Sequence, residues 1–242
     1  MNLPLPKLSF KPAKHNSAWI VLALMAVQTS LACGSSPAAT VAATAPPTAA
    51  PTDDPNPPPD GWNLVLREQF DKDGEWGIAT DSGHDVTAIV SDGALDWTLS
   101  TKDASSYRDP DLNAPLSDFM MSVNVHLVRG DGTYGVTFRA QDEGEYAFKV
   151  TYGGQYSLQF GDNSGWTKLT DWTETGVEGD SVPRRIAVRA EGDHFTMYVN
   201  DQQVGEFSDS RLKKGTVGLI VSTFDDSSIT EVKFDNLTIY AP

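Results

Sequence analysis

Apolar and polar residues alternate along most of the chain after residue 60. YGVTFRA, residues 134 to 140, is one such run, and no ten-residue stretch in this region keeps the apolar spacing of an amphipathic helix. Strict alternation is typical of strands that bury one face. The runs expected to form strands are 63–70, 93–99, 118–128, 134–140, 145–151, 155–160, 184–190, 194–201, 203–207, 215–222 and 230–240.

Short turns rich in Gly, Asp and Asn separate these runs, as in RGDG at 129–132, YGGQ at 152–155 and AEGD at 190–193. About a dozen short strands joined by tight turns in one domain are typical of a sandwich. The sequence therefore predicts an all-β domain over residues 60–242, built as a two-sheet antiparallel sandwich.

The strands between residues 122 and 160 predict a second, polar face. If the apolar residues of these strands point into the core, the residues between them point away from it. With the four strands in one sheet, these residues would form a single polar band: Asn124, His126, Thr137, Arg139, Lys149, Thr151 and Gln159. Such a band could hydrogen-bond a sugar, or it could be a solvated sheet face without a ligand. Both interpretations stay open at this point.

Three of the six tryptophans bear on these alternatives. Trp97 alternates with Leu95 and Leu99, which predicts a core position. Trp166 and Trp172 lie in the turn-rich stretch GWTKLTDWTETG, beside the predicted band. They could form a stacking platform for a pyranose ring, or they could pack beneath this loop.

The N-terminal residues have the pattern of an export signal. Lys7, Lys11 and Lys14 precede the uncharged run SAWIVLALMAVQTSLAC, which is shorter than the roughly 20 apolar residues of a membrane span. Its end, TSLAC, resembles the lipobox of bacterial lipoproteins, although Ser30 stands where a leucine is most frequent. This resemblance predicts a signal peptide over 1–32 and lipidation of Cys33, the single cysteine of the chain. Ordinary secretion with an incidental cysteine is the alternative.

Residues 33–59 are rich in Pro, Ala and Thr and contain almost no large apolar side chains. Such a segment cannot bury enough surface to offset the entropy of ordering, so it is predicted to be a disordered tether. The protein would then be held outside the cytoplasm, attached to the cell envelope through a lipid on Cys33. Its domain would be in contact with the membrane only through this anchor, and is predicted to be a monomer.

Charge excludes one class of partner. Three of the 18 basic residues and two of the 33 acidic residues precede residue 60, so the domain has a formal net charge of 15 − 31 = −16. Nucleic acids and anionic lipid surfaces are bound by basic surfaces. We therefore expect no nucleic acid among its partners.

The order of motifs along the domain is similar to that of a known superfamily. LSDFMMSVNVHL, GVTFRA, YAFKV, GQYSLQF, IAVRAEGDHFTMYVND, KKGTVGLIVS and VKFDNLTIY follow one another over nearly all of residues 60–242. This order resembles concanavalin A-like lectin and glucanase jelly rolls, in the branch with laminin G-like domains, family 16 glycoside hydrolases and 3-keto-disaccharide hydrolases. The resemblance implies a jelly roll whose polar face binds carbohydrate.

Motifs for catalysis are missing or incomplete. There is no Gly-x-Ser-x-Gly, and the histidines His84, His126 and His194 are too scattered for a zinc site. The Glu-x-Asp-x-x-Glu of family 16 is absent, and the acidic cluster Asp142, Glu143 and Glu145 is predicted to lie in a turn. Of the 3-keto-disaccharide hydrolase pattern, only Gly135, Phe138 and Arg139 match.

A structural calcium ion is the one cofactor that the resemblance suggests. Jelly rolls of this type often hold an ion between an acid near the first strand and an aspartate in the last strand. Glu68 or Asp71, together with Asp235, occupy these places.

The sequence thus favours a cell-surface lipoprotein with a non-catalytic, carbohydrate-binding jelly roll. A glycoside or 3-keto-disaccharide hydrolase is the first alternative, and a structural or adhesive display domain is the second.

Overall fold

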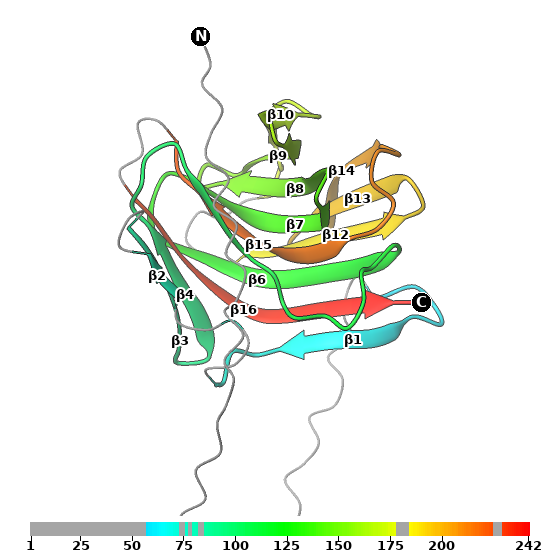
Figure 1. Ribbon diagram of the computed structural model, residues 1–242, viewed down its shortest axis with the longest axis horizontal. Helices are drawn as coiled ribbons and strands as arrows, with labels where there is room; N and C mark the ends of the chain where they lie inside the picture. The colour runs from blue at the N-terminus through cyan, green and yellow to red at the C-terminus, as the bar shows by residue number, and fades with distance from the viewer. Residues whose placement is uncertain (1–56, 73–75, 77–78, 82–84, 178–183, 225–228) are drawn as a thin grey trace, which may run out of the picture. The chain divides into compact units, whose positions relative to one another are not determined.

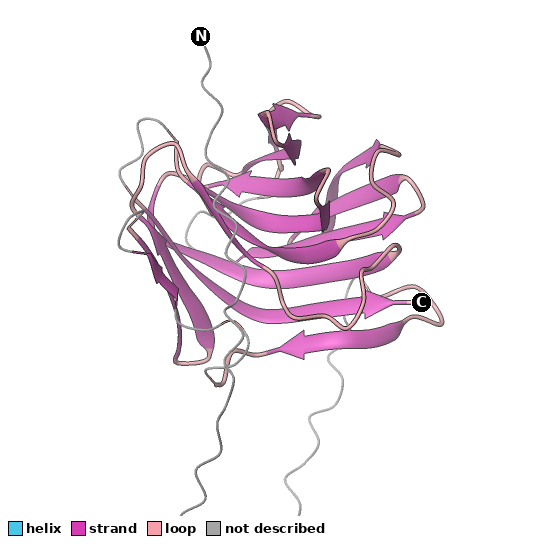
Figure 2. Ribbon diagram, in the orientation of Figure 1, coloured by secondary structure: helices cyan, strands magenta, loops and turns pink. Residues whose placement is uncertain are grey.

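The computed structural model describes residues 57–72, 76, 79–81, 85–177, 184–224 and 229–242. Within them the chain forms strands and no helix, and these strands make two antiparallel sheets packed as a sandwich (Figures 1 and 2). This confirms the predicted jelly roll. No helix that could cross a membrane occurs in the part of the chain that the structure describes. The predicted signal peptide, Cys33 and residues 34–56 of the tether lie outside it.

One sheet contains nine strands and includes both ends of the folded chain. Its order is β14-β13-β12-β6-β16-β4-β3-β2, and β1 pairs with β16. The bounds are β1 Asn63–Glu68, β2 Ala79–Asp81, β3 Val86–Ser91, β4 Ala94–Leu99, β6 Phe119–Gly130, β12 Arg184–Glu191, β13 His194–Val199, β14 Gln202–Ser208 and β16 Thr230–Ala241.

The other sheet contains seven strands and is built mainly from the middle of the chain. Its order is β10-β9-β8-β7-β15-β5, and β11 also pairs with β9. The bounds are β5 Ser105–Arg108, β7 Thr133–Gln141, β8 Gly144–Thr151, β9 Gln155–Asp162, β10 Gly165–Lys168, β11 Thr173–Glu174 and β15 Thr216–Ser222.

The core lies between the sheets and is formed by the alternating apolar residues that the sequence identified. Trp97 is fully buried there and packs edge-on against Phe234, as expected. Phe138 and Tyr146 of the seven-stranded sheet pack against Phe195 of the nine-stranded sheet, with centroid separations of 5.0 and 4.8 Å. Phe138 and Tyr146 lie on the inner face of the seven-stranded sheet, so the residues that alternate with them form its outer face.

Two buried arginines connect the sheets, one at each end of the sandwich. Arg184, at the start of β12, donates hydrogen bonds to the carbonyl oxygens of Thr151 and Tyr152, in the β8–β9 turn of the opposite sheet. Arg139 of β7 does the same at the other end, where its guanidinium reaches the β12–β13 turn. Each arginine thus fastens a turn of the opposite sheet.

Candidate functional site

The outer face of the seven-stranded sheet is defined by the residues that alternate with its core residues. Cross-strand pairing arranges them in rows, and the two central rows are Tyr107–Ile220–Gly135–Lys149–Ser157 and Gly218–Thr137–Ala147–Gln159–Lys168. The adjoining rows are Ser105–Ser222–Thr133–Thr151 and Glu145–Gly161–Trp166. Most of these side chains are polar, and many are buried although they lie outside the core.

Lys149 is the most unusual residue of the outer face. Its side chain is 5% exposed, and its Nζ lies 4.1 Å from the centroid of the Trp166 ring. Burial lowers the pKa of Lys149 to about 7, and the charge of Glu145 opposes this shift only in part. Lys149 forms no hydrogen bond or ion pair with another residue that the structure describes. The face therefore contains a cation that is partly compensated by an aromatic ring.

The position of Trp166 depends on a glycine in the neighbouring strand. Trp166 of β10 pairs with Gly161 of β9, and a Cβ atom added to Gly161 would lie 2.8 Å from the indole ring. The missing side chain lets the ring lie close to the backbone of β9 and reach Lys149. Trp166 thus lies on the outer face beside Lys149, and its role as a stacking platform stays a prediction.

The charges of two carboxylates act on the hydroxyl of Tyr107. Burial raises the pKa of Tyr107, and the charges of Glu145 and Asp109 raise it further. Asp109 follows β5, and its Oδ2 accepts a hydrogen bond of 3.1 Å from the hydroxyl of Thr216. Its Oδ1 occupies the space that a side chain at Gly218 would need, 2.1 Å from an added Cβ. The small residue at 218 thus makes room for a carboxylate above β15.

Thr137 lies in the same row as Gly218 and is the best candidate for a ligand-binding hydroxyl. Its side chain is 0% exposed, and its Oγ1 has no hydrogen-bond partner among the described residues. A buried hydroxyl without a partner is costly, so such groups often mark a place that a ligand or water satisfies.

Four predicted site residues are brought together on the outer face: Thr137, Lys149, Gln159 and Trp166. Thr151 lies at its end, where its hydroxyl accepts a hydrogen bond of 3.1 Å from the backbone N–H of Gln155 and closes the β8–β9 turn. Trp172 packs edge-on against Phe224, with centroids 6.4 Å apart. Trp172 precedes β11, which pairs with β9, and Phe224 follows β15. Because β8 and β7 lie between β9 and β15, the contact of the two rings crosses the ends of β8 and β7.

The prediction that Asn124 and His126 belong to the same band is wrong. Both residues are on β6, which lies in the nine-stranded sheet between β12 and β16. Asn124 pairs with Arg185 and Asp235, and His126 pairs with Lys233. Alternation along β6 gave the correct facing of each residue, but it does not specify the sheet to which a strand belongs.

The prediction that Arg139 points outward is also wrong, and a β-bulge is the reason. Between Phe138 and Gln141, β7 has one residue more than β8, and Arg139 has a φ of 52°. The extra residue resets the alternation, so the side chain turns to the edge of the core. There it donates hydrogen bonds to the carbonyl oxygens of Ser117, Gly192 and Leu212, and its charged partner is Asp118, at 3.9 Å, rather than Asp142 or Glu145.

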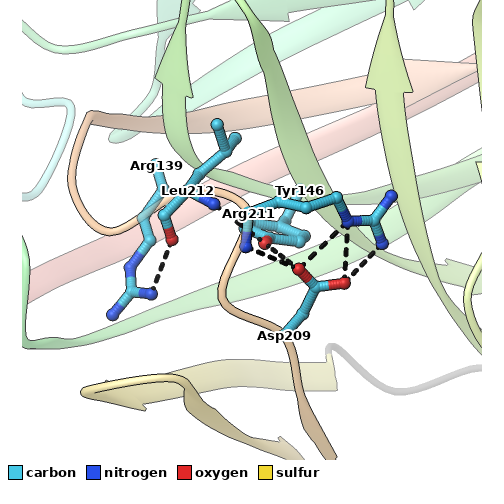
Figure 3. A network of polar contacts seen from close by, with 5 residues as sticks. All are labelled: Arg139, Tyr146, Asp209, Arg211 and Leu212. Atoms are coloured by element: carbon cyan, nitrogen blue, oxygen red, sulfur yellow. Dashed lines mark hydrogen bonds and ion pairs between the residues drawn. The ribbon is translucent and has the colours of Figure 1, made fainter.

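A second polar network holds the loop that follows β14. The hydroxyl of Tyr146 donates a hydrogen bond of 2.7 Å to the carboxylate of Asp209, which also accepts hydrogen bonds from the side chain and backbone of Arg211 (Figure 3). Burial alone would raise the pKa of Asp209, but these hydrogen bonds lower it to about 2. The next residue, Leu212, accepts from Arg139, so both networks fix this loop.

Sequence reasoning missed the carboxylates of the outer face. Glu145 was placed in the turn with Asp142 and Glu143, but it lies within β8 and is 9% exposed. Period-two alternation back from Lys149 would have placed it on this face. Tyr107 lies in the short strand β5 and Asp109 directly follows this strand; the stretch has no clear pattern, and no sequence signal connects it to residues 133–168.

The calcium site stays a prediction. Asp71 and Asp235 are close enough that the charge of Asp71 raises the pKa of Asp235, after the larger effect of burial. However, Glu68 accepts a hydrogen bond from the backbone N–H of Phe70, and the oxygens of Asp235 accept from Asn236. Among the described residues, no three His, Cys, Asp or Glu side chains form a group that could hold an ion. The three predicted acids therefore do not form a complete ligand set.

Comparison with known proteins shows the fold. No protein-family model and no curated protein sequence matches the chain. The κ-carrageenase from Pseudoalteromonas carrageenovora, solved with an oligotetrasaccharide of κ-carrageenan, is similar with a TM-score of 0.54 and 13% identity, over 78% of this chain and 99% of that one.

Two glucanases are similar to the same degree. The β-glucanase from Bacillus licheniformis has a TM-score of 0.53 and 8% identity, over 73% of this chain and 97% of that one. The laminarinase catalytic domain from Thermotoga maritima has a TM-score of 0.53 and 11% identity, over 75% and 98%. The described domain therefore has the concanavalin A-like jelly-roll fold that these glucanases share.

Proposed function

We propose that the domain binds carbohydrate on the outer face of the seven-stranded sheet. The observation that carries the proposal is the combination of Trp166 and Lys149 with the unpartnered hydroxyl of Thr137 on one face. Sugar hydroxyls need fixed hydrogen-bond donors and acceptors, and the C–H faces of sugar rings pack on aromatic side chains. Gln159, in the row between Ala147 and Lys168, adds an amide to the same surface.

A second candidate is a glycoside hydrolase, and one observation favours it. Burial raises the pKa of Tyr107, and the charges of Glu145 and Asp109 raise it further, so two carboxylates act on one hydroxyl of the outer face. Glycosidases use such pairs as acid and base or nucleophile. The two residues come from β8 and the end of β5, with β7 and β15 between them. Because this pair matches no glycosidase motif in the sequence, we propose binding without catalysis.

A glycan array with the domain, residues 57–242, tests the proposal. We expect binding to at least one oligosaccharide and no release of reducing ends from it. Replacing Trp166 by alanine should weaken this binding about tenfold, which corresponds to about 1.4 kcal/mol, since an aromatic contact is lost. Tyr152→Ala, in the exposed β8–β9 turn, is the control and should leave the affinity unchanged.

Other outcomes identify the alternatives. Release of reducing ends that is abolished by Glu145→Gln would establish the hydrolase. Absence of binding to every glycan would disprove the proposal and favour a structural or adhesive display domain.

We also propose that the domain is held at the cell envelope by a lipid on Cys33, at the end of a signal peptide. Replacing Cys33 by serine should block processing, because lipoprotein signal peptidase cleaves only after the cysteine has been lipidated. The measurement is the size and location of the protein in cell fractions. A mature Cys33→Ser protein, free in the medium and normally processed, would show that an ordinary signal peptidase acts here.

A further inference from the structure

We propose that the glycan bound by the outer face is acidic, and that Lys149 contacts its negatively charged substituent, a carboxylate or a sulfate ester. This inference rests on the proposed function and names the class of its ligand. It is carried by the surroundings of Lys149 and by the distribution of charge over the face.

The charge of the Lys149 ammonium group is only partly compensated. Glu145 offsets part of the effect of burial on its pKa, but no hydrogen bond or ion pair joins the ammonium group to another described residue. The side chain of Lys149 is 5% exposed, and its described contact is the ring of Trp166. Burying an ammonium group without an anion or hydrogen-bond acceptors is unfavourable, and natural proteins rarely do so outside functional sites. A negatively charged group of the ligand would supply what is missing.

The neighbours of Lys149 on this face are uncharged. They are Gly135 of β7 and Ser157 of β9 across the strands, and Ala147, two residues earlier on β8. None of these three side chains can form an ion pair with it. Ser157 instead donates its hydroxyl hydrogen to the carbonyl oxygen of Thr170, at 2.8 Å.

The other charges of the outer face compensate Lys149 only in part. Glu145 is four residues back on the same strand, in the row of Trp166, and its charge offsets part of the effect of burial on the pKa of Lys149. Tyr107 lies in the same row as Lys149, with Gly135 and Ile220 between them, and Asp109 follows on the far side of the face. Lys168 of β10 is 51% exposed and pairs with Asp171 at 3.6 Å. Among the described residues, β7, β9 and β15 present no charged side chain to this face.

The face therefore has carboxylates at Asp109, after β5, and at Glu145, at the start of β8, while Lys149 lies further along β8. An acidic glycan would be placed with its charged substituent at Lys149 and its neutral hydroxyls toward Asp109 and Tyr107. Beside the row of Lys149 and Tyr107 lies the row with the small residues Gly218, Thr137 and Ala147.

The protonation state of Lys149 also supports the proposal that the ligand is acidic. Because burial lowers the pKa of Lys149 to about 7, half of these side chains are neutral at pH 7. An anion stabilises the charged form, so binding above pH 7 must take up a proton. Affinity for an acidic glycan should then fall about tenfold for each pH unit above 7, until the pKa of the complex is reached.

The experiment uses matched pairs of glycans that differ in charge alone. Oligogalacturonates are compared with their methyl esters, and sulfated galactan oligosaccharides with their desulfated forms, by calorimetric titration of the 57–242 domain at pH 6 and pH 8. We expect the charged member of at least one pair to bind 10-fold or more tightly at pH 6, with this advantage reduced at pH 8. Which pair responds distinguishes the carboxylate from the sulfate ester.

Variants of Lys149 test the contact itself. Lys149→Met should remove the preference for the charged glycan over the neutral member of the pair, and the pH dependence of that preference. Lys149→Arg should retain a preference for the charged member. Lys214→Met makes the same change of charge at an exposed position before β15 and should have no effect.

The failure of this inference can be distinguished from failure of the proposed function. If neutral glycans bind as well as charged ones, and Lys149→Met changes neither, the inference is wrong but carbohydrate binding stands. If no glycan of either kind binds, while circular dichroism shows the domain folded, the proposed function fails as well.

Discussion

Replacing Arg139 by alanine is expected to lower the free energy of unfolding by about 3–5 kcal/mol, the range for removing one member of a buried charged interaction. The guanidinium is 0% exposed and donates hydrogen bonds to three backbone carbonyl oxygens that lie far apart in the sequence. It also lies 4.9 Å from the Phe195 ring. Its loss leaves these carbonyls without a donor and opens space beside Phe195. Urea denaturation followed by tryptophan fluorescence measures the change.

Arg129→Ala is the matched control for this variant. Arg129 has a side chain that is 62% exposed and pairs with Glu231 on the surface of the nine-stranded sheet. Exposed ion pairs contribute little, so this change should cost under about 1 kcal/mol. An Arg139→Ala variant that is as stable as the control would show that water replaces the guanidinium without loss.

Replacing Lys149 by methionine is expected to stabilise the protein, and the size of the effect should depend on pH. The pKa of Lys149 falls from 10.5 in the unfolded chain to about 7 in the folded protein, so folding disfavours the charged form. This penalty is complete below pH 7, at most about 5 kcal/mol, and disappears as the pH rises to 10.5. We expect a gain of about 2–4 kcal/mol at pH 6, since structural relaxation lowers the penalty.

The pH dependence of the effect distinguishes removal of the buried Lys149 charge from improved packing by methionine. Above pH 7 the unfolded chain binds more protons at Lys149 than the folded protein does, so the wild-type protein gains stability with rising pH. The advantage of the variant should shrink by about 1.4 kcal/mol per pH unit between pH 7 and 9.5. Lys168→Met, at an exposed position of the same face, should change stability by under about 1 kcal/mol at every pH. An advantage of Lys149→Met that is constant over this range would contradict the assignment.

Together, these two variants separate structural from functional charges. Arg139 is buried with its acceptors in place, and its removal should cost stability. The charge of Lys149 is buried and only partly compensated by Glu145, and its removal should gain stability while weakening the proposed contact with an acidic ligand. A residue that lowers stability in the free protein is typical of a binding site.

The period-two alternation predicted the strands of the fold, because it indicates which residues of each strand face the core and which face outward. Phe138, Tyr146 and Leu158 lie in the core and Thr137, Lys149 and Gln159 on the outer face, as the pattern indicated. Alternation describes neighbours along one strand, and strands of both sheets show it. It therefore does not identify the sheet to which a strand belongs. This is why Asn124 and His126 were assigned the correct facing and the wrong sheet.

Arg139 could not be placed from the sequence for a different reason. A bulge adds one residue to a strand, and a glycine with positive φ often marks it in the sequence. Here the residue with positive φ is Arg139, so the sequence gives no such sign. The glycine that accommodates this bulge is Gly215, where an added Cβ would lie 2.3 Å from the backbone carbon of Arg139. Because residues 139 and 215 are far apart in the chain, no local pattern connects them. The same separation hid Tyr107 and Asp109.

The hydrogen bonds of Arg139 limit how freely the loops at this end of the domain can vary. Many β-sandwiches change their loops freely, because each loop contacts mainly its own two strands. Here the segment before β6, the β12–β13 turn and the loop before β15 each give one carbonyl oxygen to the same guanidinium. An insertion in any one of them would move its carbonyl and affect the other two. Loop exchange at this end should therefore require all three segments to be transplanted together.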